Sequence, residues 1–323
     1  MVSQNYKVAI IVTLAGLYAM QSIATTYSKD ESGKYAYNAN VAVMSTEFLK
    51  VLIAAALLKK ESDGTEQRPK TTFDAATVLR FAVPALLYMC GNNLVYAALK
   101  HLDAPTFQVM GNLKIVVVAV VQRIALRSQK MMVQWLGVVA LMLGMLIIGV
   151  GKASENGPKD ASPSIEGEPG DLYLGAIFML CVAMASALAG VYTEFLLKSL
   201  DLSVNFQNIL LYTWGIVFCL VANASGAVDQ GTVDGGLFAG FDHRTWMVVI
   251  INSCLGQVVS RVMKYADNVT KIFSASAGVI ITMVVSVYLF DFPVTMLFSL
   301  GTAIVVLACT LFFLPPDWLL HMV

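Results

Sequence analysis

Four charged residues, Glu47, Lys50, Lys114 and Glu194, lie in stretches that are otherwise apolar. A charged side chain at the centre of a membrane-spanning helix costs about 2.5–3.5 kcal/mol on insertion scales. Such residues must therefore face protein or a water-filled cavity rather than lipid. Glu47 and Lys50 are three residues apart, so they can form an ion pair, either a structural one or part of a substrate site. Lys114 has no acid one helical turn away, and this indicates an anionic ligand.

Other polar side chains recur at spacings of three and four residues, which place them on one face of a helix. The predicted faces are Tyr18, Gln21, Ser22 and Thr25; Tyr88, Asn92 and Tyr96; Gln108, Gly111 and Lys114; Ser186, Gly190 and Glu194; Asn205, Asn208 and Tyr212; Gln257, Ser260, Arg261 and Lys264; and Lys271, Ser274 and Gly278. The amides and hydroxyls could instead bond neighbouring helices, and the glycines could serve close packing. The tyrosines could pack or could stack on a base. We interpret these faces as the lining of a shared cavity.

Residues suited to catalysis are few. His101, His243 and His321 lie outside the apolar stretches, and the sequence has no H-E-x-x-H, G-x-S-x-G or P-loop motif. The five cysteines lie in apolar runs without C-x-x-C spacing, as small hydrophobic residues do. We therefore expect a protein that is not an enzyme, with no metal and no cofactor. A membrane-embedded enzyme acting through carboxylates on lipid-linked sugars stays the alternative.

The composition predicts an all-α membrane protein. Of 323 residues, 58% are hydrophobic and 13% charged, whereas a soluble domain carries about 25% charged residues. A net charge of zero gives no reason to expect nucleic acid as a partner. About 20 apolar residues cross a bilayer as a helix, and the first run is too long for a signal peptide. We predict ten transmembrane helices, near residues 7–27, 38–58, 77–99, 105–126, 132–150, 171–197, 205–222, 244–263, 271–289 and 294–314.

The chain divides into two similar halves. A hydrophilic stretch rich in Gly, Pro and Ser, residues 151–171, reads as a lumenal linker between residues 1–150 and 172–323. AGLY at 15–18 matches AGVY at 189–192, and one constant offset aligns Lys100 with Lys264 and Gly137 with Gly301. Because each half has five predicted helices, the two repeats have opposite orientation. Inverted repeats are typical of secondary transporters, which bind substrate near the membrane midplane.

The orientation follows from Lys and Arg. Most of those outside the predicted spans, such as Lys59, Arg127 and Lys198, fall on the side that carries the N-terminus. The positive-inside rule therefore predicts that both termini are cytosolic.

Five segments together resemble one family of transporters. They are STEFLK (45–50), LLYMCGNNLVYAALKHLDAPTFQVMGNLKI (86–115), AGVYTEFLLK (189–198), FQNILLY (206–212) and KYADNVTKIFSAS (264–276). The chain resembles the nucleotide-sugar transporters of the drug/metabolite transporter superfamily, most closely the CMP-sialic acid transporter branch. This resemblance covers nearly the whole chain. It implies ten helices in two inverted five-helix repeats, residence in the Golgi membrane, and exchange of cytosolic CMP-sialic acid for lumenal CMP by alternating access.

The same resemblance implies roles for nine residues. Lys114 and Lys271 look like the phosphate contacts. Tyr88 and Asn92 look like contacts to the base or ribose, and Lys50 looks like a contact nearer the sugar. Further positions in the cavity are Gly190, Asn208, Tyr212 and Ser260.

Three features depart from the family pattern and bear on which sugar the transported nucleotide carries. Phe107 stands where the sialic-acid branch has a tyrosine, GNN at 91–93 lacks a polar residue before the two asparagines, and FQN at 206–208 lacks an arginine before Asn208. A same-fold transporter of another nucleotide sugar, such as UDP-galactose, is therefore an alternative. An exporter of amines is a further one, and Lys114 argues against it because a buried cation repels a cationic substrate.

Two N-x-S/T glycosylation acceptors test the predicted orientation. Asn223 falls in a predicted lumenal loop and Asn268 in a predicted cytosolic one. We expect that only Asn223 can receive a glycan in microsomes, provided that it stands far enough from the membrane. A glycan at Asn268, seen as a mass shift that the Asn268→Gln variant loses, would reverse the predicted orientation.

Overall fold

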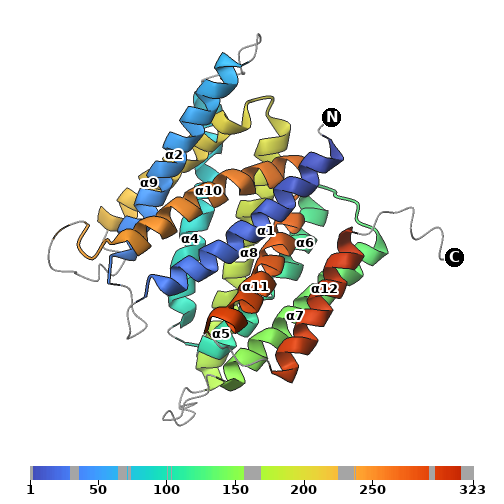
Figure 1. The fold of residues 1–323 in the computed structure, drawn as a ribbon. Coiled ribbons are helices and arrows are strands. Elements are labelled where there is room, and N and C mark those ends of the chain that lie inside the picture. Colours follow the sequence, from blue (N-terminus) through green and yellow to red (C-terminus); the bar gives the residue numbers. More distant parts are fainter. Residues whose placement is uncertain are drawn as a thin grey trace. The chain divides into compact units, whose positions relative to one another are not determined.

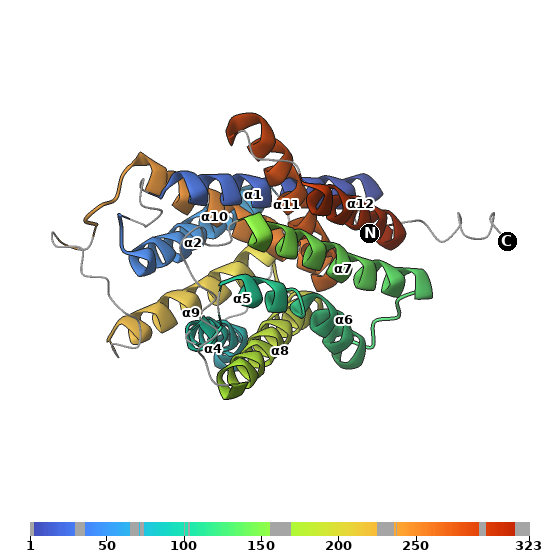
Figure 2. The same ribbon diagram turned by 90° about the horizontal axis from the view of Figure 1, so that it is seen from below.

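The computed structural model describes residues 3–29, 36–64, 71, 74–99, 101–102, 104–155, 169–224, 236, 238–290 and 295–313. Within these ranges the chain forms helices and no strand, which confirms the all-α prediction (Figures 1 and 2). The helices are α1 (Gln4–Tyr27), α2 (Ala39–Asp63), α3 (Ala75–Arg80), α4 (Ala82–Leu99), α5 (Ala104–Gly111), α6 (Lys114–Ala125), α7 (Met132–Glu155), α8 (Pro169–Ser199), α9 (Val204–Ala224), α10 (His243–Tyr265), α11 (Asn268–Phe290) and α12 (Met296–Phe313).

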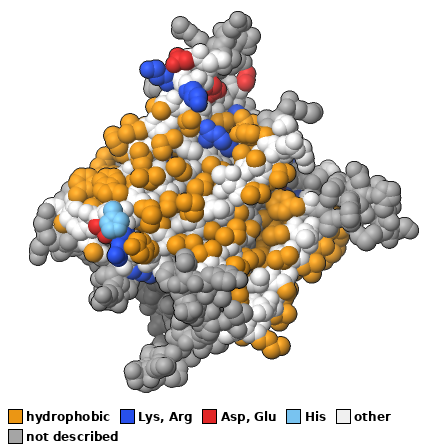
Figure 3. All heavy atoms as spheres, in the orientation of Figure 1, with side chains coloured by type: hydrophobic (Ala, Val, Ile, Leu, Met, Phe, Trp, Pro, Cys, Tyr) orange, Lys and Arg blue, Asp and Glu red, His pale blue; other side chains and the backbone are white. Residues whose placement is uncertain are grey.

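Eight of the helices in the described part are long and apolar enough to cross a membrane: α1, α2, α7, α8, α9, α10, α11 and α12. Each matches one of the predicted spans. The predicted spans 77–99 and 105–126 instead consist of two helices each, α3 with α4 and α5 with α6. The predicted count of ten spanning helices is therefore not confirmed. Figure 3 shows hydrophobic side chains over the helices that face the viewer, with charged side chains gathered near helix ends.

The sequence at each interruption explains it. Pro84 lies in the first turn of α4, where its missing N–H is tolerated, but in a continuous helix its ring would clash with the carbonyl of residue 80. Where α5 ends, Gly111 and the Asn112 that follows it are weak helix formers. The Asn112 side chain donates to the Met145 carbonyl on α7 (3.3 Å), so it stabilises the turn from outside.

The described chain forms two compact units, each built from both halves of the sequence. Unit 1 contains residues 1–89 and 192–282, and unit 2 contains residues 90–191 and 283–323. In unit 1, α2 packs against α9 and α10, and α10 packs against α1 (Figure 1). Gly278 allows α11 to approach α1 closely, because a Cβ there would lie 2.7 Å from the Tyr18 Cβ.

In unit 2, α7 and α12 pack along their lengths (Figures 1 and 2). Glycines make this possible: a Cβ at Gly144 would lie 2.7 Å from Val305, and one at Gly301 would lie 2.6 Å from Ile148. Gly137 also lies in this pair of helices: a Cβ at Gly137 would lie 3.1 Å from the Ala308 carbonyl oxygen of α12. Gly137 and Gly301, which the sequence offset aligns, therefore lie in the same helix pair. The inverted repeat itself stays a prediction.

The loops predicted from sequence are shorter in the structure. α7 continues to Glu155 and α8 begins at Pro169, so both take residues from the predicted 151–171 linker. The rest of that linker, 156–168, lies outside the described residues. Asn223 lies in the last turn of α9, directly after the membrane span, while Asn268 is fully buried at the start of α11.

Candidate functional site

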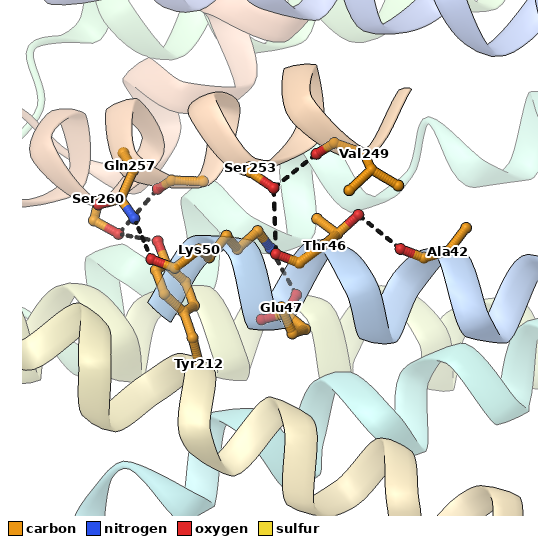
Figure 4. Close-up of polar contacts among 10 residues, drawn as sticks. Ala42, Thr46, Glu47, Lys50, Tyr212, Val249, Ser253, Gln257 and Ser260 are labelled. Atoms are coloured by element: carbon orange, nitrogen blue, oxygen red, sulfur yellow. Dashed lines mark hydrogen bonds and ion pairs between the residues drawn. The ribbon is translucent and has the colours of Figure 1, made fainter. Parts of the chain in front are cut away.

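An ion pair lies on α2 inside unit 1 (Figure 4). The Lys50 ammonium is 2.6 Å from a Glu47 carboxylate oxygen, as the three-residue spacing allows. The Lys50 and Glu47 side chains are only 16% and 17% exposed, respectively. The Lys50 Nζ also lies 5.1 Å from the centroid of the Tyr212 ring on α9, close enough for a cation–π interaction. The sequence predicted this pair as one of two alternatives, and the structure confirms that the two charges meet.

Two glycines on neighbouring helices make room for the pair. A Cβ at Gly215 of α9 would lie 3.0 Å from the second carboxylate oxygen of Glu47. A Cβ at Gly256 of α10 would lie 2.8 Å from the Lys50 Cε and 3.2 Å from the Tyr212 hydroxyl. The acid therefore lies against the backbone of α9 and the base against the backbone of α10. A side chain at either glycine would have to displace one member of the pair.

Buried amides and hydroxyls join the three helices around this pair (Figure 4). The Gln257 amide of α10 donates to the Lys50 carbonyl (2.9 Å) and accepts from the Asn208 amide of α9 (3.0 Å). The Tyr212 hydroxyl is 3.3 Å from that of Ser260. Asn208 is fully buried, and its Oδ1 has no hydrogen-bond partner among the described residues. We call Glu47, Lys50, Asn208, Tyr212, Gln257 and Ser260 the α2–α9–α10 network.

Two further predicted site residues belong to unit 1. Tyr88 on α4 is 36% exposed and hydrogen-bonds with Thr193. Lys271 is half-buried in the first turn of α11. Unit 1 thus contains six of the nine predicted residues, and the network contains four of them.

The other three predicted residues, Asn92, Lys114 and Gly190, belong to unit 2. Lys114 is the first residue of α6, directly after the interruption that follows α5, and its side chain is exposed. No hydrogen bond or ion pair connects it to another residue of the described part. Gly190 is buried in α8, whereas Asn92 lies on α4 with its side chain outside the described part. Lys114 thus has no polar partner among the described residues, and its role toward a ligand stays a prediction.

The predicted faces of α8 and α10 also include charges that serve the fold. Glu194, 2% exposed, accepts from the Lys198 ammonium (2.6 Å) and from the Asn268 backbone N–H (2.9 Å). It therefore joins the end of α8 to the start of α11. Arg261 donates to the side-chain Oδ1 of Asn205 (2.8 Å), and the Asn205 side-chain amide in turn donates to the Glu61 carboxylate (2.9 Å).

This second polar cluster borders a cavity of about 390 Å³. Both acidic and basic groups line the cavity, since Asp201, Glu61, Arg261 and Lys264 are among its residues.

Sequence reasoning placed Gln257 on a polar face but did not include it in the site, and it did not select Gly215 or Gly256. The available signal was weak: each glycine lies in the interior of an apolar helix, where glycine costs about 1 kcal/mol relative to alanine. Only the neighbouring charges of α2 show why glycine stands there.

Removing the Gln257 amide tests whether the network holds unit 1 together. Gln257→Leu keeps the volume but leaves the fully buried Asn208 amide without its acceptor. We expect a loss of about 1–3 kcal/mol in stability, measured as a lower thermal midpoint in detergent. The matched control is Gln21→Leu on α1, since Gln21 is half-buried and has no hydrogen bond within the described chain. Equal midpoints for the two variants would contradict a structural role for the network.

Comparison with known proteins identifies the family to which the chain belongs. A family model described as nucleotide-sugar transporter matches residues 2–313. The CMP-sialic acid transporter 1 of Oryza sativa subsp. indica is 34% identical over 99% of this chain and 97% of its own length. The CMP-sialic acid transporter 1 of Arabidopsis thaliana is 34% identical over 98% and 92%, respectively. The UDP-N-acetylglucosamine transporter of Rattus norvegicus is 33% identical over 88% and 87%.

A solved crystal structure has the same fold, with a TM-score of 0.68, 12% identity, and coverage of 97% of this chain and 98% of that chain. At that identity the likeness concerns the fold alone. The family match extends over nearly the whole sequence, and the relatives are similar over nearly all of both chains. The chain therefore belongs to the nucleotide-sugar transporter family.

Proposed function

We propose that this transporter is an antiporter in the Golgi membrane, with both termini cytosolic, that exchanges cytosolic CMP-sialic acid for lumenal CMP by alternating access. The observation that carries the proposal is Lys114, a cation on an interrupted apolar helix that has no partner among the described residues. Relatives named CMP-sialic acid transporter favour CMP as the nucleotide. All the relatives considered are named transporters, which supports a carrier rather than an enzyme.

The proposed ligand contacts divide by the chemistry of the nucleotide. Lys114 and Lys271 replace the water that the phosphate loses on entering the protein, since bonds between ionised groups are the strong ones. Tyr88 offers a ring for stacking on the base, and Asn92 offers an amide for its edge. Lys50 lies toward the sugar. The remaining proposed contacts are Gly190, Asn208, Tyr212 and Ser260.

Exchange follows from the electrostatics of the empty site. An empty carrier whose Lys114 has lost its anionic partner must carry that uncompensated charge through an apolar surrounding when it changes orientation, and this is unfavourable. The loaded carrier therefore changes its orientation faster than the empty one. In an inverted-repeat carrier, rocking one repeat against the other presents the site to each side of the membrane in turn. Because the carrier returns faster with a ligand bound than empty, it mainly exchanges one ligand for another.

One second candidate rests on a specific observation. A relative named UDP-N-acetylglucosamine transporter is 33% identical over 88% of this chain. A uridine nucleotide carrying an uncharged sugar, including the UDP-galactose considered from sequence, is therefore the alternative substrate. The phosphate contacts are the same in both cases, while the base contacts and the charge near Lys50 differ.

Proteoliposomes test the exchange directly. We expect vesicles preloaded with CMP to take up labelled CMP-sialic acid much faster than empty vesicles, because the return step is then loaded. UMP inside the vesicles should stimulate this uptake less than CMP does. Uracil presents a different hydrogen-bonding edge from cytosine, and a base that leaves buried groups of the site unpaired binds more weakly. Equal uptake into empty and CMP-loaded vesicles would contradict exchange, and stronger stimulation by UMP than by CMP would favour the UDP-sugar alternative.

A further inference from the structure

The Glu47–Lys50 pair is more confined than an ordinary ion pair on a helix surface. Exposed pairs of this spacing contribute little, because water screens them and their side chains move freely. Here both side chains are less than a fifth exposed, and the backbones of α9 and α10 lie against them at Gly215 and Gly256. Gln257 also holds the Lys50 carbonyl. The Lys50 ammonium is therefore held in one place on α2, and any other anion that pairs with it must take the place of Glu47 there.

An exchanger of the proposed kind faces a particular electrostatic problem at its sugar end. Its two substrates differ there, because CMP-sialic acid carries a sugar with a carboxylate and CMP carries no sugar. A lysine suited to bind that carboxylate would be left without a partner whenever CMP occupies the site. An unpaired charge in a low-dielectric surrounding is strongly destabilising. The site therefore needs an anion that replaces the carboxylate when the sugar is absent.

We propose that Glu47 is this anion and thereby a specificity-determining residue: it neutralises Lys50 when CMP is bound, and the carboxylate of an acidic sugar displaces it when the nucleotide sugar is bound. The inference rests on the proposed function. Two charges on one helix, 2.6 Å apart and lying against glycine backbones on both sides, carry it. Glu47 limits the preference for the acidic sugar, because the incoming carboxylate must compete with it for Lys50.

Charge-changing variants separate this role from a structural one. Glu47→Gln removes the carboxylate that competes for Lys50, so the preference for CMP-sialic acid over CMP should increase. Lys50→Gln removes the cation, and the remaining Glu47 repels the sugar carboxylate, so the preference for CMP-sialic acid over CMP should decrease. The double variant is neutral like the wild-type pair, so it should return the preference toward the wild-type value.

The measurement is the dissociation constant of CMP divided by that of CMP-sialic acid, on the purified full chain in detergent. We expect this ratio to rise about tenfold in Glu47→Gln, the scale of a bond to a charged group, and to fall by a similar factor in Lys50→Gln. The corresponding ratio for UMP and UDP-N-acetylglucosamine should stay constant in Glu47→Gln, because that sugar has no carboxylate. Glu61→Gln is the matched control, since Glu61 lies on the same helix and bonds to Ser203 and Asn205 instead.

The outcomes distinguish this inference from the proposed function. If the wild type binds both cytidine nucleotides but Glu47→Gln leaves their ratio unchanged, the inference is wrong and the proposed function stands. The inference is also wrong if Glu61→Gln shifts the ratio as much as Glu47→Gln does. If the wild type binds neither CMP nor CMP-sialic acid, both the proposed function and the inference are wrong.

Discussion

A charged side chain in the apolar interior of a membrane must have a partner, and the described structure provides one at nearly every such position. Lys50 pairs with Glu47 at 2.6 Å, and Glu194 accepts from both Lys198 and the start of α11. Lys114 differs, because nothing in the described part of the chain neutralises it. This difference favours the anionic ligand of the proposed function, since an anion would neutralise the Lys114 ammonium.

In unit 1, the packing of α2, α9 and α10 allows Lys50 to keep Glu47 as its partner in the protein interior. Glycines at 215 and 256 let α9 and α10 approach the ion pair of α2, and Gln257 fixes the backbone of Lys50. The three contributions depend on one another. The glycines leave space for the two charged side chains, the Gln257 amide binds the backbone carbonyl of Lys50, and Glu47 neutralises the Lys50 ammonium. The result is a buried ion pair that three helices of unit 1 hold in place.

The sequence predicted those parts of the fold that depend on local composition. Eight spanning helices were found because each is a long apolar run. The interruptions near Pro84 and at Gly111–Asn112 were missed, because average hydrophobicity does not register a single residue that breaks a helix. Likewise the three-residue spacing predicted a possible Glu47–Lys50 contact, and the absence of a nearby acid predicted that Lys114 is unpaired. The roles of Gly215, Gly256 and Gln257 could not be predicted, since they depend on which helices are neighbours.

The affinity of the Lys114→Ala variant for CMP tests the central claim most directly. If the phosphate is the missing partner of Lys114, removing the ammonium should weaken binding by about 1.5–3 kcal/mol, measured by titration calorimetry on the purified protein. Lys114→Arg should restore the affinity only in part, because the guanidinium is a bulkier fork than the ammonium. An unchanged dissociation constant for CMP in Lys114→Ala would contradict the account, since the Lys114 ammonium would then not be a contact of the nucleotide.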